Sequence, residues 1–315
     1  MHFLAPLLAL ISVISPTRTW YAPSQPLTVD IKSAGESKLV LVDFTTGKPI
    51  DAKAPADVSG DKTVDLKTLY AEVSAPGTYV LFVVPKGKQL AEFDGTPLLI
   101  EVRADHRRGA PAEPDVIKVG PLEYAVMSTE KGPLTMMFYY DVAPITAGSF
   151  LDLARTGYFD GLTFHRIMPG FVLQGGDPKG DGTGGPGYNV QAEFNDRPHL
   201  EGVLSMARQG DPNERAGAMP RPEFANSAGS QFFICLDYNT TRQLDHKYTA
   251  FGRVVDGMKA AKEIAAVPLA DPEAGKPATP HVIPKVEVKP VTAAEDPYAE
   301  FLHLKEPAAP AATPK

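Results

Sequence analysis

The sequence predicts a mainly β protein of two domains. Short runs rich in Val, Ile, Phe and Tyr recur along the chain, with Gly, Pro and Asp turns between them, as is typical of strands joined by tight connections. Two segments show the apolar spacing of helices. The chain has 315 residues, which suggests about two domains, and its hydrophobic fraction of 43% is sufficient for ordinary cores.

The first domain is expected over residues 20–104 as a small β-sandwich. Leu27, Val29 and Ile31 alternate with polar residues. Three further β-rich runs follow, at 38–44, 79–84 and 98–102. Several strands at this spacing predict two packed antiparallel sheets. The segment holds no catalytic constellation, so we expect it to bind, space or anchor; a purely structural role is the alternative.

Residues 1–19 are interpreted as a signal peptide. The apolar run Phe3–Ile14 is about twelve residues long, too short to span a bilayer but suited to the core of an export signal. Its basic flank is poor, and Ser15–Trp20 lacks a clear cleavage pattern. We therefore expect an exported protein, periplasmic or secreted. The alternatives to a signal peptide are a first strand or an imprecise choice of start site, and the alternative location is cytoplasmic. No later segment predicts a membrane span.

A second domain is expected over residues 119–290. The preceding segment 105–118 combines charge, Gly and Pro without periodicity, which predicts a linker. The Pro- and Ala-rich segment 291–315 is expected to be a tail, disordered at its end.

The second domain opens with the pattern of a β-hairpin, in which strand-like runs at 124–129 and 134–140 are joined by a short turn. A helix is predicted after Pro144, a residue that suits the first turn, and Gly157 is expected to end it. Another helix is predicted over 256–266, because its apolar residues fall on one face.

Composition excludes several classes of protein. The net charge is -7 with mixed signs and no basic stripe, so we expect no nucleic-acid partner. The single cysteine, Cys235, excludes an intrachain disulfide, and its apolar surroundings predict a small buried side chain. The histidines are scattered without the spacing of metal ligands. We expect a monomer that needs neither metal nor cofactor.

The stretch Phe164–Asp177, FHRIMPGFVLQGGD, places one cation, Arg166, among apolar residues and follows it with the amide of Gln174. A charge in such surroundings is costly unless it is hydrogen-bonded or put to use. Taken alone, the pattern also fits a buried arginine paired with a carboxylate. Four further motifs follow in order: GDGTGG at 180–185, LSMAR at 204–208, NSAGSQFFICL at 226–236 and LDHKYTAFGRV at 244–254.

These five motifs resemble the cyclophilin family of peptidyl-prolyl cis-trans isomerases, in a bacterial-like form with an extra N-terminal β-domain. The resemblance covers residues 122–266. It implies a closed eight-stranded antiparallel barrel capped by two helices, and accelerated rotation of X-Pro bonds. The implied partners are proline-containing peptides and unfolded client proteins. A non-catalytic proline-peptide binding module or chaperone holdase is the alternative function.

The resemblance also implies roles for individual residues. Arg166 matches the family's essential arginine, which addresses the prolyl bond. Gln174 matches the glutamine that orients this arginine and hydrogen-bonds the substrate. The proline pocket is expected from Phe171, Val172, Phe233 and Leu244, and Phe171 is expected to be catalytic together with Arg166 and Gln174. The substrate groove is expected from Gly182, Ala207, Arg208 and Gln231.

Several positions of this site depart from the usual family pattern. Val172 replaces Met, which leaves a roomier pocket, and Arg208 replaces an Asn that contacts the peptide largely through its backbone. Tyr248 replaces a pocket His, and Gln243 stands where many members carry Trp. The loop 211–225 is longer than in compact members, and we expect it to border the groove and shape specificity.

Two other motifs do not carry a function. Gly180–Gly185 matches a dinucleotide-binding fingerprint in spacing, but Pro186 and Gly187 follow where a helix is required. Ser227 and Ser230 lack the nucleophile elbow of a serine hydrolase.

Overall fold

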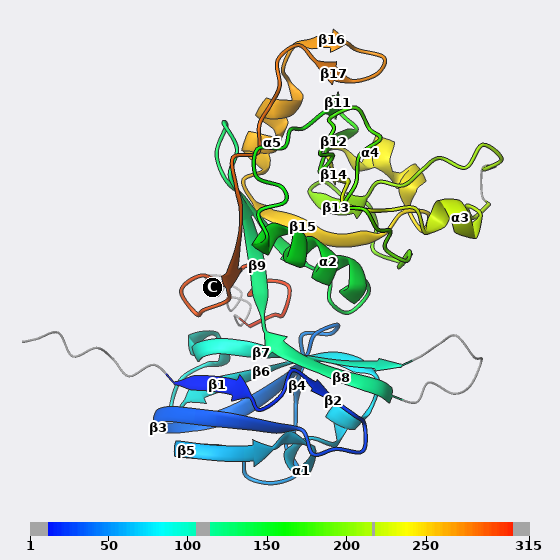
Figure 1. Ribbon diagram of the computed structural model, residues 1–315. Coiled ribbons are helices and arrows are strands. Elements are labelled where there is room, and N and C mark those ends of the chain that lie inside the picture. The colour runs from blue at the N-terminus through cyan, green and yellow to red at the C-terminus, as the bar shows by residue number, and fades with distance from the viewer. Residues whose placement is uncertain (1–11, 105–113, 216–217, 305–315) are drawn as a thin grey trace, which may run out of the picture. The chain divides into compact units, whose positions relative to one another are not determined.

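A computed structural model describes residues 12–104, 114–215 and 218–304. The chain divides into two compact units (Figure 1). Unit 1 comprises Met1–Leu122 together with Pro290–Lys315, and unit 2 comprises Glu123–Lys289. Unit 2 is therefore inserted between two parts of unit 1 in the sequence.

Unit 1 is built on one eight-stranded antiparallel sheet. Its path runs β1-β3-β6-β7-β8-β2, and both β4 and β5 pair with β3 (Figure 1). The strands are β1 (Val13–Pro16), β2 (Trp20–Tyr21), β3 (Thr28–Asp43), β4 (Pro49–Ile50), β5 (Asp57–Asp65), β6 (Gly77–Pro85), β7 (Asp94–Ala104) and β8 (Pro114–Pro121). The short helices are α1 (Leu66–Leu69), η1 (Ala71–Ser74) and η2 (Leu90–Glu92).

The pairings among these strands do not confirm the expected sandwich of two sheets. The first half of β3 pairs with β1 and β5, and its second half pairs with β6. A register shift between Ser33 and Ser37 lies between the two halves. One long strand thus continues the hydrogen-bond ladder through the unit, and a single open sheet results. Turn spacing alone does not reveal a strand that is shared in this way.

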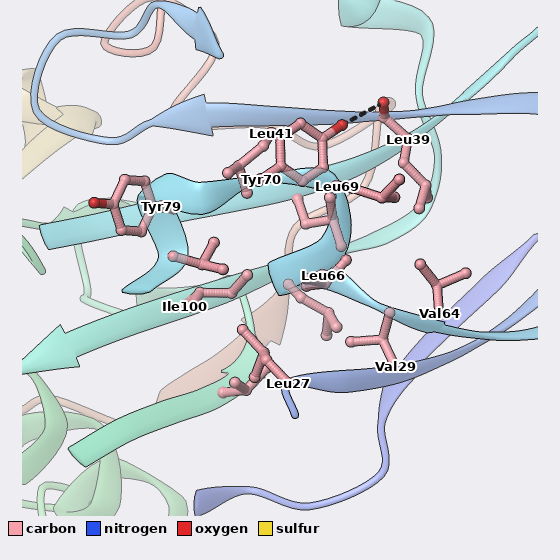
Figure 2. Close-up of a cluster of buried hydrophobic side chains, with 14 of the residues drawn as sticks. Leu27, Val29, Leu39, Leu41, Val64, Leu66, Leu69, Tyr70, Tyr79 and Ile100 are labelled. Atoms are coloured by element: carbon pink, nitrogen blue, oxygen red, sulfur yellow. Dashed lines mark hydrogen bonds between the residues drawn. The ribbon is translucent and has the colours of Figure 1, made fainter. Parts of the chain in front are cut away.

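The core of unit 1 follows the alternation seen in the sequence. Leu27 and Val29 are buried in one cluster with Leu39 and Leu41 (Figure 2). Ile31 belongs to the same cluster. α1 lies beside this cluster and begins after Asp65, whose carboxylate accepts the Lys67 N–H at 3.1 Å.

A buried tyrosine ties the short helices of unit 1 to the sheet. The Tyr70 hydroxyl donates a hydrogen bond to the Leu39 carbonyl at 2.8 Å (Figure 2). Burial raises the pKa of Tyr70 to about 12, although a backbone hydrogen bond opposes the shift. The hydroxyl is therefore protonated at neutral pH and remains a donor.

The described part of the expected signal peptide, residues 12–19, contains strand β1 (Val13–Pro16). β1 pairs with β3, and Ile14 is only 7% exposed within the core cluster. These residues therefore form the first strand that was the alternative to a signal peptide. The strand packs onto the core through the apolar side chain of Ile14. The part of the apolar run before Ser12 lies outside the described residues, so export stays a prediction.

Parts of the expected linker and tail are also folded. Residues 114–118 belong to β8, which pairs with β7 because Ile117 and Val119 alternate into the core. In the C-terminal segment, Tyr298 is buried and packs edge-on against Phe44 with ring centroids 5.9 Å apart. The remaining residues of both segments, 105–113 and 305–315, lie outside the described part.

Unit 2 is built on a curled antiparallel sheet in the order β11-β12-β14-β13-β15-β10-β9-β18 (Figure 1). Its strands are β9 (Glu123–Met127), β10 (Leu134–Phe138), β11 (Arg166–Met168), β12 (Val172–Gly175), β13 (Val203–Met206), β14 (Phe232–Cys235), β15 (Ala250–Asp256) and β18 (Val286–Pro290). A small hairpin pairs β16 (Leu269–Asp271) with β17 (Lys276–Pro277). The pairings among the described strands follow a path and do not establish the closed ring that was expected.

The hairpin and the two longer helices predicted for unit 2 are present. β9 pairs with β10, and the helices are α2 (Pro144–Arg155) and α5 (Met258–Ala265). Shorter helical turns are α3 (Pro222–Ala225), α4 (Tyr238–Thr241) and η4 (Arg242–Leu244).

A distant carboxylate satisfies the start of α2. The residue before the helix, Ala143, has no side-chain acceptor, and Glu193 supplies one instead. Its carboxylate accepts the N–H of Ile145 at 3.0 Å and that of Thr146 at 2.8 Å. A negative charge at this end also complements the helix dipole. The Glu193 segment is thereby fixed to the helix.

Candidate active site

Arg166 lies on β11, the edge strand, directly opposite Gln174 on β12. Its Nη1 donates to Gln174 Oε1 at 3.3 Å, and the residue is half-buried. Within the described part of the chain, the Arg166 guanidinium forms no ion pair with a carboxylate. The alternative of a buried arginine–carboxylate pair is therefore not what forms here.

Two of the residues predicted for catalysis, Arg166 and Gln174, share one face of the sheet with the predicted pocket residue Phe233. Arg166, Gln174 and Phe233 are directly opposed across β11, β12 and β14, and Ser205 on β13 continues the row. Opposed residues of antiparallel strands point to the same side. Alternate residues point to the other side, where Phe232 meets Phe150 edge-on at 5.5 Å. The strand period thus separates the candidate site from the aromatic core.

An apolar cluster occupies the site face next to this row. The predicted pocket residues Val172, Phe233 and Leu244 are buried in it, and Cys235 is buried there as predicted. Phe171, Ala207 and Tyr248 are partly buried and pack against the same cluster. The structure therefore brings together all the residues expected to form the proline pocket.

Amide side chains connect the arginine to a glycine-rich loop. Gln174 Nε2 donates to Gln231 Oε1 at 3.1 Å. Gln231 Nε2 in turn donates to the carbonyls of Gly182 at 3.0 Å and Gly184 at 2.9 Å. Arg166 is thus the first member of a hydrogen-bonded series that ends on the loop backbone.

Asp177 shapes this loop. The residue is 1% exposed, and its carboxylate accepts the N–H groups of Lys179 at 2.8 Å, Asp181 at 3.1 Å and Gly182 at 2.5 Å. A Cβ at Gly184 would lie 2.0 Å from Asp177 Oδ1, so only glycine fits at this position. The GDGTGG motif is therefore the sequence of a loop that wraps a buried carboxylate.

A groove of about 720 Å³ runs along this loop. All four residues predicted for the substrate groove line it, together with Gln174: Gly182, Ala207, Arg208 and Gln231. The remaining predicted residue, Gln243, is exposed on η4, where its Nε2 donates to the Thr240 carbonyl at 2.9 Å.

A buried polar group that no sequence motif indicates lies behind the pocket. His199 is fully buried, with Nδ1 2.9 Å from Asp245 Oδ1 and Nε2 3.0 Å from Ser205 Oγ. Its ring stacks near Phe233, with centroids 6.3 Å apart. Because Ser205 is also fully buried and its hydroxyl donates to the Thr249 carbonyl, this set has no accessible nucleophile. His199 and Asp245 lie 46 residues apart in the sequence, so no local motif contains both.

The charges of this group follow from its burial. Burial lowers the pKa of His199 and therefore favours the neutral ring. The carboxylate of Asp245 acts in the opposite direction, but its effect is smaller. For Asp245, burial raises the pKa, but hydrogen bonds from the His199 backbone, the His199 ring and Tyr238 together hold it below its ordinary value.

Comparisons with known proteins agree with this geometry. The family described as "Cyclophilin type peptidyl-prolyl cis-trans isomerase/CLD" matches residues 124–288. A peptidyl-prolyl cis-trans isomerase of Synechococcus elongatus is 46% identical over 132 residues, which are 42% of this chain and 80% of that protein. Peptidyl-prolyl cis-trans isomerase B of Bacillus subtilis is 42% identical over 129 residues, 40% of this chain and 79% of that protein.

A solved structure is also similar. It is a cyclophilin type peptidyl-prolyl cis-trans isomerase of Cryptosporidium parvum in the presence of the dipeptide Ala-Pro. Its sequence is 28% identical to this chain. The match covers 53% of this chain and 99% of that one, with a TM-score of 0.46. Over the described residues of the present chain, no helix is long and apolar enough to cross a membrane.

The family match spans slightly more than half of the sequence and lies entirely within unit 2. The relatives are matched over most of their own length. This chain therefore belongs to the cyclophilin-type peptidyl-prolyl cis-trans isomerase family and is an isomerase of that type.

Proposed function

We propose that this isomerase accelerates X-Pro rotation in folding client proteins, and that Arg166 stabilises the twisted prolyl amide. The observation that carries the proposal is the row formed by Arg166, Gln174 and Phe233 on one face of the sheet. It sets a cation and a ring on opposite sides of an amide in the same row.

The chemistry needs no nucleophile. The amide resists rotation by about 18–20 kcal/mol because nitrogen shares its lone pair with the carbonyl. An X-Pro bond exchanges over tens to hundreds of seconds. Exchange within about a millisecond requires a barrier lower by on the order of 7 kcal/mol. A fixed donor beside the prolyl nitrogen lowers the barrier, because rotation localises the lone pair on nitrogen.

Each neighbour of Arg166 has a part in this proposal. The apolar cluster around Phe233, which includes Leu244 and has Phe171 packed against it, would hold the proline ring and exclude water. Gln174 accepts from Arg166 Nη1 and so orients the guanidinium. The groove along Gly182 and Ala207 would hold the flanking peptide. Arginine suits the task because its planar fork presents donors in a fixed geometry.

The test is exchange NMR of an Ala-Pro-containing peptide with catalytic amounts of the full chain. We expect the cis and trans signals to exchange far faster than in the free peptide. Peptide binding without any gain in the exchange rate would favour the non-catalytic binding module instead.

Export to the periplasm or exterior is a further part of the proposal, supported by the apolar run Phe3–Ile14.

A further inference from the structure

Arg208 is held by hydrogen bonds on all three of its guanidinium nitrogens. Nε donates to the Lys247 carbonyl at 3.1 Å, and Nη1 donates to the Gln209 carbonyl at 3.0 Å. Nη2 donates to Glu214 Oε2 at 2.8 Å, and the side chain is only 2% exposed. A guanidinium bound in this way cannot rotate without breaking several hydrogen bonds, so it presents a fixed planar face.

That planar face lies on a ring of the proline pocket. Arg208 Cζ is 4.3 Å from the centroid of the Tyr248 ring. The Tyr248 ring meets Phe233 edge-on, with centroids 5.9 Å apart. The interaction energy of a cation over an aromatic face depends on the orientation of the two groups, and so does that of an edge-to-face ring pair. The position of Arg208 therefore fixes the angle at which Tyr248 packs against the pocket.

Glu214 supplies the negative charge that this buried arginine requires. Its carboxylate also faces Lys247, whose Nζ lies 3.6 Å from Oε1. A buried cation that loses its counter-ion is left with an uncompensated charge. Glu214 thus stabilises Arg208 where it is, under Tyr248, and the pocket geometry depends on a residue that lines neither the apolar cluster nor the groove.

A second ion pair holds the loop segment that carries Glu214. The Glu214 N–H donates to the Asp211 carbonyl at 3.0 Å. The buried Asp211 carboxylate accepts from the Arg221 N–H at 3.0 Å and from Arg221 Nη2 at 2.9 Å. The backbone of Glu214 is therefore anchored independently of its side chain, so that its charge can be changed without releasing the loop.

We propose that Glu214 is a specificity-determining positioning residue, which fixes Arg208 and thereby holds the Tyr248 ring against the pocket for the substrate proline. The inference rests on the proposed function. It assigns the long loop a role in affinity for X-Pro peptides rather than in the rotation step, because none of these contacts involves Arg166.

The experiment compares full-length Glu214→Gln with the unmodified chain on an Ala-Pro-containing peptide. Exchange NMR gives the rate on the enzyme, and titration gives the affinity. We expect KM to rise about threefold to tenfold, since one oriented cation–π contact is loosened, while kcat stays within about twofold. The Tyr248 ring signals should shift or broaden in the same variant.

Glu223→Gln is the matched control. It removes a carboxylate that pairs with Arg221 Nη1 at 3.1 Å, in the same stretch of chain and without touching Arg208. KM and the Tyr248 signals should not change in it. In a Tyr248→Leu background, Glu214→Gln should add no further rise in KM, because Glu214 acts through that ring.

The outcomes separate the two proposals. An unchanged KM in Glu214→Gln with an active parent would overturn the positioning role, and so would a full effect in the Tyr248→Leu background. A parent that binds the peptide without accelerating exchange would overturn the proposed function. The Tyr248 signals of Glu214→Gln would still decide the positioning of that ring.

Discussion

Arg166 and Phe233 both stand directly opposite Gln174, one on each side of it, in the same row of the sheet. Neighbouring strands are about 4.8 Å apart, so the two backbones are separated by roughly 10 Å. Two long side chains on the same face can both reach a ligand placed between them. A proline ring against Phe233 would bring its amide nitrogen within reach of Arg166, which is the arrangement that the proposed mechanism needs.

Arg166→Ala should lose most isomerase activity. We expect kcat/KM to fall about 10²- to 10³-fold, as for removal of a single preorganised donor. Arg166→Lys should not restore it, because lysine presents a mobile point charge in place of a planar fork. Exchange NMR of an Ala-Pro-containing peptide measures the rate, and circular dichroism checks the fold.

Arg253→Ala is the control for that substitution. Arg253 is exposed on β15 in the same sheet, outside the candidate site. Its removal should leave kcat/KM within about twofold. Near-normal turnover in Arg166→Ala, or an equal loss in Arg253→Ala, would contradict the role assigned to Arg166.

His199 should make unit 2 less stable as the pH falls from 7 to 5. Burial lowers the pKa of the folded His199 below the ordinary value of 6.5. Below pH 6.5 the unfolded chain binds a proton that the folded chain does not, so the free energy of unfolding falls. The slope from this group is at most about 1.4 kcal/mol per pH unit. Asp245 contributes only at lower pH, because its pKa is held below 3.8.

His199→Gln removes this titration and should give a shallower pH dependence. Urea unfolding followed by the methyl NMR signals of unit 2 measures it at each pH. Burial also lowers the pKa of His165, but that contribution is common to both proteins and cancels. His246→Gln, which changes an exposed ring, serves as the control. Parallel pH profiles for His199→Gln and the parent would show that His199 is not the group responsible.

The site could be predicted from the sequence to the extent that it is local. Arg166 and Gln174 sit on two short strands joined by a tight turn, so one continuous motif contains both. Phe233 lies in another motif with strand alternation. The resemblance therefore identified the row, and the structure brings its members together.

What the sequence could not show depends on distant contacts. His199 meets Asp245 across 46 residues, and neither belongs to a pattern that predicts the other. Arg208 donates to Glu214, which lies in a loop without periodicity. β3 joins two groups of strands that turn spacing would assign to separate sheets. In each case the partner is selected by the tertiary fold rather than by propensity.

The native protein should begin near residue 20 if it is exported. Mass spectrometry of the N-terminus from native cells measures this directly. Removal of residues 1–19 also removes β1, and Ile14 then leaves the core. Burial of one large aliphatic side chain contributes about 1.5–3 kcal/mol. A recombinant chain starting at residue 20 should therefore lose about this much stability in unit 1, and a native chain that still carries Phe3–Ile14 would contradict export.

Truncation after Pro290 should destabilise unit 1 and leave turnover unchanged. The lost segment carries Tyr298 and Leu302, which are buried, and Phe44 would lose its contacts with Tyr298 and Phe301. We expect the free energy of unfolding of unit 1 to fall by at least about 2 kcal/mol. Trp20, the single tryptophan of the chain, lies on β2 and reports this unit alone when urea unfolding is followed by fluorescence.

Truncation after Leu304 is the control for this experiment, since it keeps every one of these side chains. It should leave the Trp20 transition where it is in the full chain. Exchange of the Ala-Pro-containing peptide should be equally fast in all three proteins, because the site row and its pocket belong to unit 2. If the two truncations unfold at the same urea concentration, the segment 291–304 does not stabilise unit 1. Slower exchange in the shorter protein would show instead that the isomerase site depends on unit 1.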